Sequence, residues 1–294
     1  MIELYPLYFL FFALGTVFGS FLNLVSDRII SGSSILFGRS VCDYCRNPLN
    51  PKNLVPLFSY FFQRGKSACC KKSLSWSYPL SEFMTGAAFL FSAYYSKVLI
   101  NFSFSNLLVC LYLISVLSFF IVLFFTDAKH RLLPDKIVYT AIFVTLLFIL
   151  ILYLVDLKIY YDTLQIGTFG QYLIKAGFWK NHLFLVLKQF MVLIASSFFI
   201  SFFFMALIFI TKGRGMGGGD VKLGFLIGLF NGFPGNVLAI FLGFLFGSLY
   251  SLLLISLKKK SIKDTIAFGP FLILGSVVAF VWGEQIIRWY LGLV

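Results

Sequence analysis

Charged side chains are scarce in this chain. Of its 294 residues, 12% are charged and 60% are hydrophobic. A soluble domain needs more polar surface than that to remain in solution, which excludes a soluble globular fold. The apolar residues come in blocks of about 20, the length that crosses the hydrocarbon core of a bilayer. The composition therefore predicts an all-α polytopic membrane protein.

Nucleic-acid motifs are lacking as well. The net charge is +13, but no basic helix or aromatic RNA-binding motif accompanies it, so nucleic acid is not an expected partner. In a membrane protein Lys and Arg collect in cytoplasmic loops and meet anionic head groups, which makes membrane lipids the expected contact. The first apolar stretch also lacks the basic start and the cleavage site of a secretory signal. We expect it to be retained as a span.

The apolar blocks predict eight transmembrane helices. They lie near residues 5–26, 79–98, 105–126, 137–155, 185–211, 221–231, 235–257 and 266–290. The sixth is short and rich in glycine, which is tolerated in a tilted or broken helix packed against protein. The connection over residues 156–182 is polar and aromatic, and we expect a small surface helix there.

The basic residues predict the orientation of these spans. Lys and Arg concentrate in the loops that follow the first, third, fifth and seventh spans, whereas the loops near residues 97–105 and 231–235 are almost uncharged. Because basic loops remain in the cytoplasm, we expect all four of them there and both termini outside.

Two acids stand at the edges of apolar runs. Asp127 directly follows LSFFIVLFFT, and Asp220 directly precedes VKLGFLIGLF. Both are expected at the membrane boundary on the same face, where an acid is costly unless it is paired, hydrated or functional. A carboxylate that only caps a helix or pairs with a Lys is the alternative for either one.

Glycines set Asp220 apart from an ordinary capping residue. The segment Gly213–Asp220 places five glycines before the acid. Glycine permits close approaches that side chains forbid, so a substrate strand can lie against this backbone. We predict that Gly217, Gly219 and Lys222 contact the substrate.

A pair of carboxylates can carry out peptide hydrolysis. When two acids lie close together, repulsion and desolvation keep one neutral while the other stays ionised. The ionised acid can activate water, and the neutral one can protonate the amide carbonyl. Asp127 and Asp220 are therefore the predicted catalytic residues of an aspartic peptidase. The sequence alone does not decide which of the two holds the proton.

Four of the five cysteines lie in the loop after the first span. Cys42 and Cys45 form a C-x-x-C pair, and Cys69 and Cys70 follow some two dozen residues later. Disulfides are disfavoured in the cytoplasm, whereas two cysteine pairs at this spacing suggest tetrahedral zinc. Cys110 lies inside the third span and is expected to be an inert apolar residue.

Several motifs together resemble one family, the type IV prepilin peptidases. GMGGGDVKL (Gly215–Leu223) is similar to the family's Gly-x-Gly-Asp signature, and DAKHRLLPD (Asp127–Asp135) is similar to its first aspartate motif. GSFLN, the cysteine loop, SYPLSE and FGPFL also occur in the family's order and extend the resemblance over nearly the whole chain.

The resemblance implies an activity and a location. Such enzymes cleave the short basic leader of type IV prepilins and of type II secretion pseudopilins at the cytoplasmic face of the bacterial inner membrane. Many members then methylate the new N-terminal residue with S-adenosylmethionine. By matching positions, Asp127 and Asp220 become the catalytic pair, and Asp135 is expected to be structural.

The resemblance also implies three regions. These are a first transmembrane helix (1–26), a cytoplasmic cysteine loop associated with zinc and methyl transfer (27–78), and a peptidase domain (79–294). Gly19, Ser20 and Asn23 are the expected cofactor-binding residues, although small-residue helix packing explains GSFLN equally well. No nucleotide-binding loop identifies the cofactor site.

One position departs from the family pattern. The usual second cysteine pair is also C-x-x-C, but here Ser67 stands where its first cysteine is expected. Zinc can then be held by Cys42, Cys45, Cys69 and Cys70, by three thiolates and water, or not at all. A cleavage-only peptidase, an ion-coupled transporter and a zinc-binding scaffold are the alternative functions. The transporter leaves the cysteine loop and the Asp127 motif unexplained, and the scaffold makes both aspartates dispensable.

Overall fold

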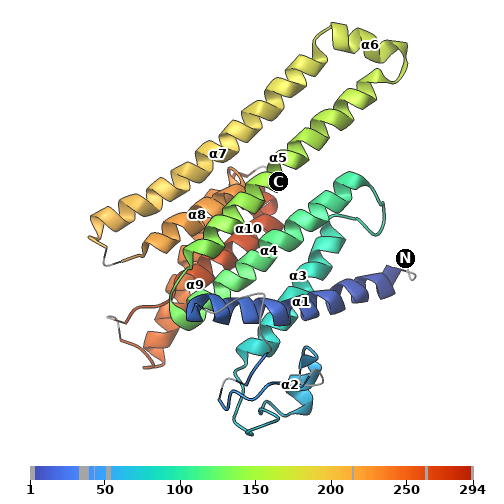
Figure 1. Cartoon of the computed structure of the whole chain (residues 1–294). Helices are drawn as coiled ribbons and strands as arrows, with labels where there is room; N and C mark the ends of the chain where they lie inside the picture. The colour runs from blue at the N-terminus through green and yellow to red at the C-terminus, as the bar shows by residue number, and fades with distance from the viewer. Residues whose placement is uncertain are drawn as a thin grey trace. The chain divides into compact units, whose positions relative to one another are not determined.

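The computed structural model describes residues 4–32, 40–42, 44–50, 54–213, 215–261 and 264–292 (Figure 1). These residues form ten α-helices, and their only β pairing consists of two isolated bridges, so the all-α prediction is confirmed. Contacts divide the chain into two compact units, residues 1–134 and 135–294. This boundary reflects packing and does not test the predicted functional division at residues 26 and 78.

Six of the described helices are long and apolar enough to cross a membrane. They are α1 (Tyr5–Ser31), α4 (Phe104–His130), α5 (Asp135–Gln165), α7 (Phe178–Ile210), α9 (Gly235–Ser256) and α10 (Gly269–Tyr290). They coincide with six of the eight predicted spans. The chain is therefore a multi-pass membrane protein.

The second and sixth predicted spans are also helices, α3 (Ser77–Tyr95) and α8 (Gly218–Asn231). Neither is among the six, and the total of eight stays a prediction. The 14 residues of α8 measure about 21 Å at 1.5 Å per residue, less than the ~30 Å of a bilayer core. The first half of α3 buries polar residues, among them Ser81, Glu82 and Thr85.

Glycines bring α1 and α3 together in the first unit. A Cβ at Gly15 would lie 2.7 Å from the carbonyl oxygen of Thr85, and one at Gly19 would lie 2.8 Å from the Cα of Glu82. Larger residues would therefore push the helices apart. Beside them, Val116, Phe120 and Leu123 bury the apolar face of α4. The short helix α2 (Phe58–Phe62) lies in the long loop before α3.

Helix α8 is the buried centre of the second unit. Its side chains Leu223, Leu226 and Ile227 are fully buried, and α5, α7, α9 and α10 all pack on it. Gly228 lets α7 approach, because a Cβ there would lie 2.6 Å from the Cα of Ser197. Its short length is therefore compatible with a membrane setting, since neighbouring helices surround it.

The predicted 156–182 connection is more helical than expected. The small helix predicted there is present as α6 (Gly167–Lys175), but α5 continues to Gln165 and α7 already begins at Phe178. The polar residues are accommodated between the two long helices. His182 Nε2 lies 3.2 Å from Asp156 Oδ2, and the rings of His182 and Tyr160 stack at 3.9 Å.

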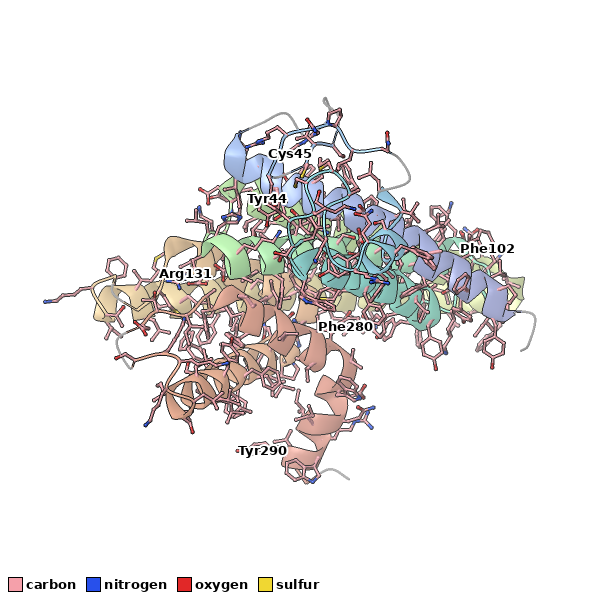
Figure 2. All side chains as sticks on the ribbon, turned by 90° about the horizontal axis from the view of Figure 1, so that it is seen from below. Tyr44, Cys45, Phe102, Arg131, Phe280 and Tyr290 are labelled. Carbon is pink, nitrogen blue, oxygen red and sulfur yellow. The ribbon has the colours of Figure 1, made fainter. Side chains whose placement is uncertain are left out.

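Exposed aromatic rings mark the ends of several helices. Phe102 lies in the turn between α3 and α4, and Tyr290 ends α10 (Figure 2). Both side chains are exposed. Aromatic residues are enriched where membrane helices meet the aqueous phase, so these positions agree with helices that end near a membrane surface.

Candidate functional site

Asp127 lies in the last turn of α4. It is 6% exposed, and the helix ends three residues later at His130. Arg131 adopts a left-handed conformation (φ 54°), and its N–H donates to the carbonyl of Asp127 at 2.8 Å. The predicted catalytic acid is therefore a buried residue at a firmly terminated helix end.

A charged contact joins this helix end to α1 and α3. The Nζ of Lys129 lies 3.3 Å from Asp27 Oδ1 and 5.2 Å from the centre of the Tyr78 ring. Lys129 is two residues beyond Asp127. The end of α4 is thus tied to the two helices that carry the GSFLN and SYPLSE motifs.

Asp220 lies in the first turn of α8 and is half-buried. Its Oδ2 accepts a hydrogen bond from the N–H of Gly217 at 3.2 Å. A Cβ on Gly217 or Gly218 would meet nothing within 4 Å. The carboxylate is thus held by the helix start beside a stretch of uncovered backbone.

Lys222 is bound by residues of α5. Its Nζ lies 2.6 Å from Asp135 Oδ1 and 4.9 Å from the centre of the Tyr139 ring. Lys222 was predicted to contact the substrate, and this geometry also gives it a structural role. This ion pair was not predicted from the sequence, although Asp135 in the first aspartate motif and Lys222 in the second were the available signal.

The predicted catalytic pair is divided between the two units. Asp127 belongs to residues 1–134, and Asp220 belongs to residues 135–294. The hydrogen bonds described for each aspartate lie within its own unit, and the pairing of the two carboxylates stays a prediction.

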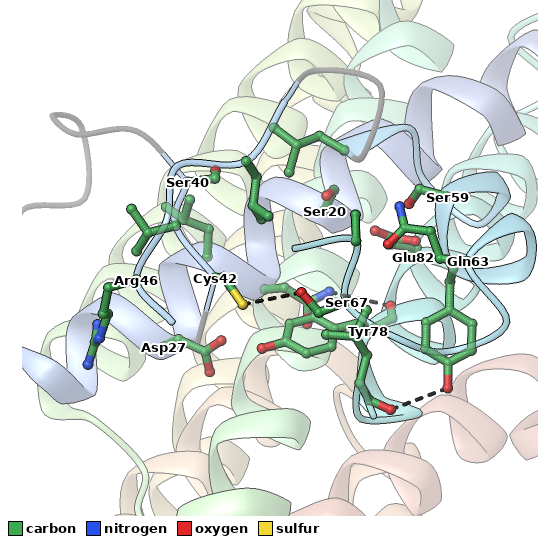
Figure 3. A pocket seen from close by; sticks show the side chains of 18 of the residues that line it. Ser20, Asp27, Ser40, Cys42, Arg46, Ser59, Gln63, Ser67, Tyr78 and Glu82 are labelled. Carbon is green, nitrogen blue, oxygen red and sulfur yellow. Dashed lines mark hydrogen bonds between the residues drawn. The ribbon is translucent and has the colours of Figure 1, made fainter. Parts of the chain in front are cut away.

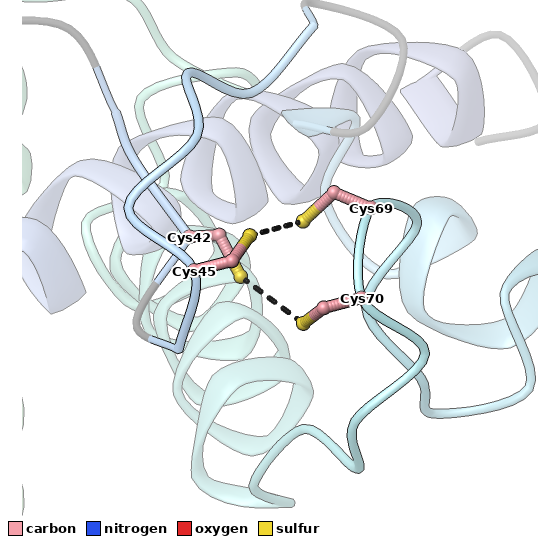
Figure 4. Close-up of side chains that lie close together, drawn as sticks. All are labelled: Cys42, Cys45, Cys69 and Cys70. Carbon is pink, nitrogen blue, oxygen red and sulfur yellow. Dashed lines mark hydrogen bonds between the residues drawn. The ribbon is translucent and has the colours of Figure 1, made fainter.

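The four loop cysteines form one cluster (Figure 4). Their sulfur atoms all lie within 4.8 Å of one another. The distance is 3.8 Å between Cys42 and Cys70 and 3.1 Å between Cys45 and Cys69. Tetrahedral zinc with Zn–S bonds of 2.3 Å requires sulfur atoms roughly 3.8 Å apart. The donor set fits such an ion once Cys45 and Cys69 separate slightly.

Two loops of the same form present these cysteines. Bridges Val41–Pro48 and Lys66–Ser73 close the two loops. In the first, the Cys42 N–H donates to Asn47 O; in the second, the Ser67 N–H donates to Lys72 O. Arg46 and Lys71 each turn the chain with φ 59°.

By this correspondence, Ser67 matches Cys42 and Cys70 matches Cys45, so Ser67 occupies a ligand position of the second loop. Cys69 reaches the cluster from the position that corresponds to Tyr44. The Ser67 hydroxyl lies 3.2 Å from Cys42 Sγ and 3.1 Å from Cys69 Sγ. The serine at position 67 therefore places a hydroxyl between the sulfurs of Cys42 and Cys69, and Cys69 supplies the fourth thiol of the cluster.

Hydrogen bonds favour the thiolate form of one of these cysteines. The Ser67 hydroxyl, together with the backbone N–H groups of Cys45 and Tyr44, lowers the pKa of Cys42 to about 6. The hydrogen bond with Cys69 raises the pKa of Cys45 to about 12. Thiolates are the form that binds metal, so Cys42 is prepared to be a ligand at neutral pH.

A cavity of about 400 Å³ lies beside the cluster, within the first unit (Figure 3). Its volume falls in the range of small-molecule sites. Among its lining residues are Ser20, Asn23, Asp27, Arg46, Cys42 and Glu82. Ser20 and Asn23 were predicted to bind cofactor, and both line it. Gly19, the third predicted cofactor residue, instead packs against α3, where its added Cβ would lie 2.8 Å from the Cα of Glu82.

Comparisons with known proteins cover nearly all of the chain. The family model for the bacterial peptidase A24 N-terminal domain matches residues 13–96, and the model for the type IV leader peptidase family matches residues 114–252. A prepilin leader peptidase/N-methyltransferase of Bacillus subtilis is 30% identical over 95% of this chain and 96% of the relative. One of Pseudomonas aeruginosa is 27% identical over 95% of this chain and 91% of the relative. No solved structure matches.

Proposed function

Because this chain belongs to the type IV leader peptidase family, we propose that it removes the leader of prepilins and pseudopilins and then methylates the new N-terminal amine. The family and the enzyme class predicted from the sequence, a prepilin peptidase with N-methyltransferase activity, are confirmed. The observation that carries the proposal is a relationship over 95% of the chain to a protein named for both activities.

In this proposal Asp127 and Asp220 hydrolyse the peptide bond. The positive end of a helix dipole stabilises negative charge in the first turn. Asp220 lies in such a turn and already accepts an N–H from Gly217. Asp220 is therefore the ionised partner that activates water, and Asp127 donates a proton to the amide carbonyl. The open backbone at Gly217 and Gly218 gives room for the substrate chain.

Zinc and S-adenosylmethionine belong to the first unit in this proposal. Cys42, Cys45, Cys69 and Cys70 offer four sulfurs for a structural zinc ion. The neighbouring cavity suits S-adenosylmethionine, because it is large enough and leaves an unsatisfied acceptor, Asn23 Oδ1, among the described residues. The cofactor would supply the methyl group, and the lining residues would orient it. The active face and the basic loops are directed to the cytoplasm.

The test uses the purified full chain in detergent with a prepilin substrate. Asp127→Asn and Asp220→Asn should each lower cleavage by at least about 100-fold, the lower range of what acid–base catalysis contributes. Asp162→Asn, which alters an exposed acid of α5, should leave cleavage unchanged. If either first variant still trims the leader at the wild-type rate, the catalytic pair is wrong.

Methylation is measured separately on a substrate whose leader is already removed. Mass spectrometry should find a methylated N-terminus with wild type and with both aspartate variants when S-adenosylmethionine is supplied. An unmodified amine in every case would support the cleavage-only alternative.

A further inference from the structure

Glu82 is a buried acid that peptide hydrolysis does not use. It lies in the first half of α3, is 8% exposed and lines the 400 Å³ cavity. Its Oε2 accepts the N–H of Leu57 at 2.7 Å, and Ser20 also bonds to the carboxyl group. Within the described ranges, no Lys, Arg or His forms an ion pair with it. A buried carboxylate without a cation is costly, which points to a positively charged ligand.

The other acid of the cavity differs from Glu82 in this respect. Asp27 lies 3.3 Å from the Nζ of Lys129, which offsets its charge. Figure 3 places Asp27 near Arg46 at one end of the cavity and Glu82 near Ser20 and Ser59 at the other. The unbalanced negative charge is therefore confined to the end formed by Glu82.

The cavity also has an acceptor that lacks a donor. The Nδ2 of Asn23 donates to Ser81 Oγ, whereas its Oδ1 is buried without a hydrogen-bond partner in the described part of the chain. Arg46, by contrast, offers positive charge to the same cavity. These groups suit a ligand that combines a positive centre, hydrogen-bond donors and a carboxylate.

We propose that Glu82 recognises the sulfonium of S-adenosylmethionine, while Arg46 faces the carboxylate of its amino-acid end. This inference rests on the proposed methyltransferase function and adds to it the residue that distinguishes the methyl donor from its product. S-adenosylhomocysteine has the same skeleton but a neutral thioether in place of the sulfonium. A carboxylate at Glu82 therefore favours the donor over the product, because the product lacks the sulfonium charge.

The experiment measures binding rather than turnover. Purified full-length protein is titrated with S-adenosylmethionine and, separately, with S-adenosylhomocysteine. Wild type should prefer the sulfonium compound. Glu82→Gln should weaken it by at least about 10-fold, the lower range of what a close charge pair contributes to binding, and should change the affinity for the thioether much less. Glu82→Asp, which retains the charge, should retain the preference.

Asp162→Asn is the control, because this exposed acid of α5 belongs to the second unit and does not line the cavity, and it should keep the preference. Cleavage of a prepilin reports that each variant is folded. The inference is overturned if Glu82→Gln keeps the wild-type preference, or if it weakens both compounds equally. If wild type binds neither compound, the cofactor part of the proposed function fails first, and the role of Glu82 fails with it.

Discussion

The two units of this protein place their polar groups differently. In residues 1–134 polar side chains such as Asn23, Ser81 and Glu82 are buried around a cavity. In residues 135–294 the central helix α8 is apolar inside, and Asp220 and Lys222 occupy its first turns. The first arrangement suits an enclosed small molecule and a metal ion. The second places a single carboxylate beside exposed backbone, which suits an extended polypeptide substrate.

The largest expected effect concerns metal in the first unit. If Cys69 replaces the missing cysteine, Cys69→Ser should remove most of the zinc, because a four-thiolate site loses a ligand. Adding Ser67→Cys to that variant should restore zinc, since residue 67 occupies the matching position of the second loop. Metal content per chain, measured by mass spectrometry of the purified protein, checks both.

One control and one further variant bear on that result. Cys110→Ser changes a buried cysteine of α4 away from the cluster and should leave metal content unchanged. Ser67→Ala should keep the ion but weaken its binding by about 10- to 100-fold, as expected for a group that bonds to ligands. Full zinc content in Cys69→Ser would show that three cysteines suffice.

The long helices could be predicted from sequence because uninterrupted apolar runs have few other structures in a membrane. Their ends could not: α5 continues past Asp156, whose carboxylate pairs with His182 of α7. Asp127 and Asp220 were singled out in the sequence because each adjoins an apolar run, and their catalytic role stays a prediction. The four-cysteine set was predicted from its spacing, but the cavity and the loop position from which Cys69 enters the cluster were not, since both depend on loops separated by about two dozen residues. The shared loop form becomes visible only in the hydrogen bonds of Cys42 and Ser67.

The second unit provides the next largest effect. Asp135→Asn removes the ion pair with Lys222, two residues beyond Asp220. Both partners are partly exposed, so the pair contributes only about 0–1 kcal/mol to stability. Cleavage should nevertheless fall by about 10- to 100-fold, because small displacements of a catalytic group are costly. Steady-state cleavage rates and thermal unfolding, measured on the same samples, separate the two effects.

Lys222→Met tests whether that effect passes through the pair. It should resemble Asp135→Asn, and the double variant should be no worse than either single one, because residues that act through one contact are not additive. If Lys222→Met alone raises the KM while Asp135→Asn does nothing, Lys222 binds substrate directly, as the sequence first predicted.

The smallest expected effect compares one glycine from each unit. A Cβ at Gly19 would lie 2.8 Å from the Cα of Glu82, so Gly19→Ala should destabilise the protein by about 1–3 kcal/mol through overpacking. Gly217 has φ −92° and open space around it, so Gly217→Ala should change stability by less than about 0.5 kcal/mol. Its added methyl group should instead slow cleavage, because it occupies the backbone that the substrate approaches. Gly19→Ala should therefore have the larger effect on thermal unfolding, and Gly217→Ala should have the larger effect on the cleavage rate. Equal loss of stability in both variants would remove the distinction between a packed first unit and an open start of α8.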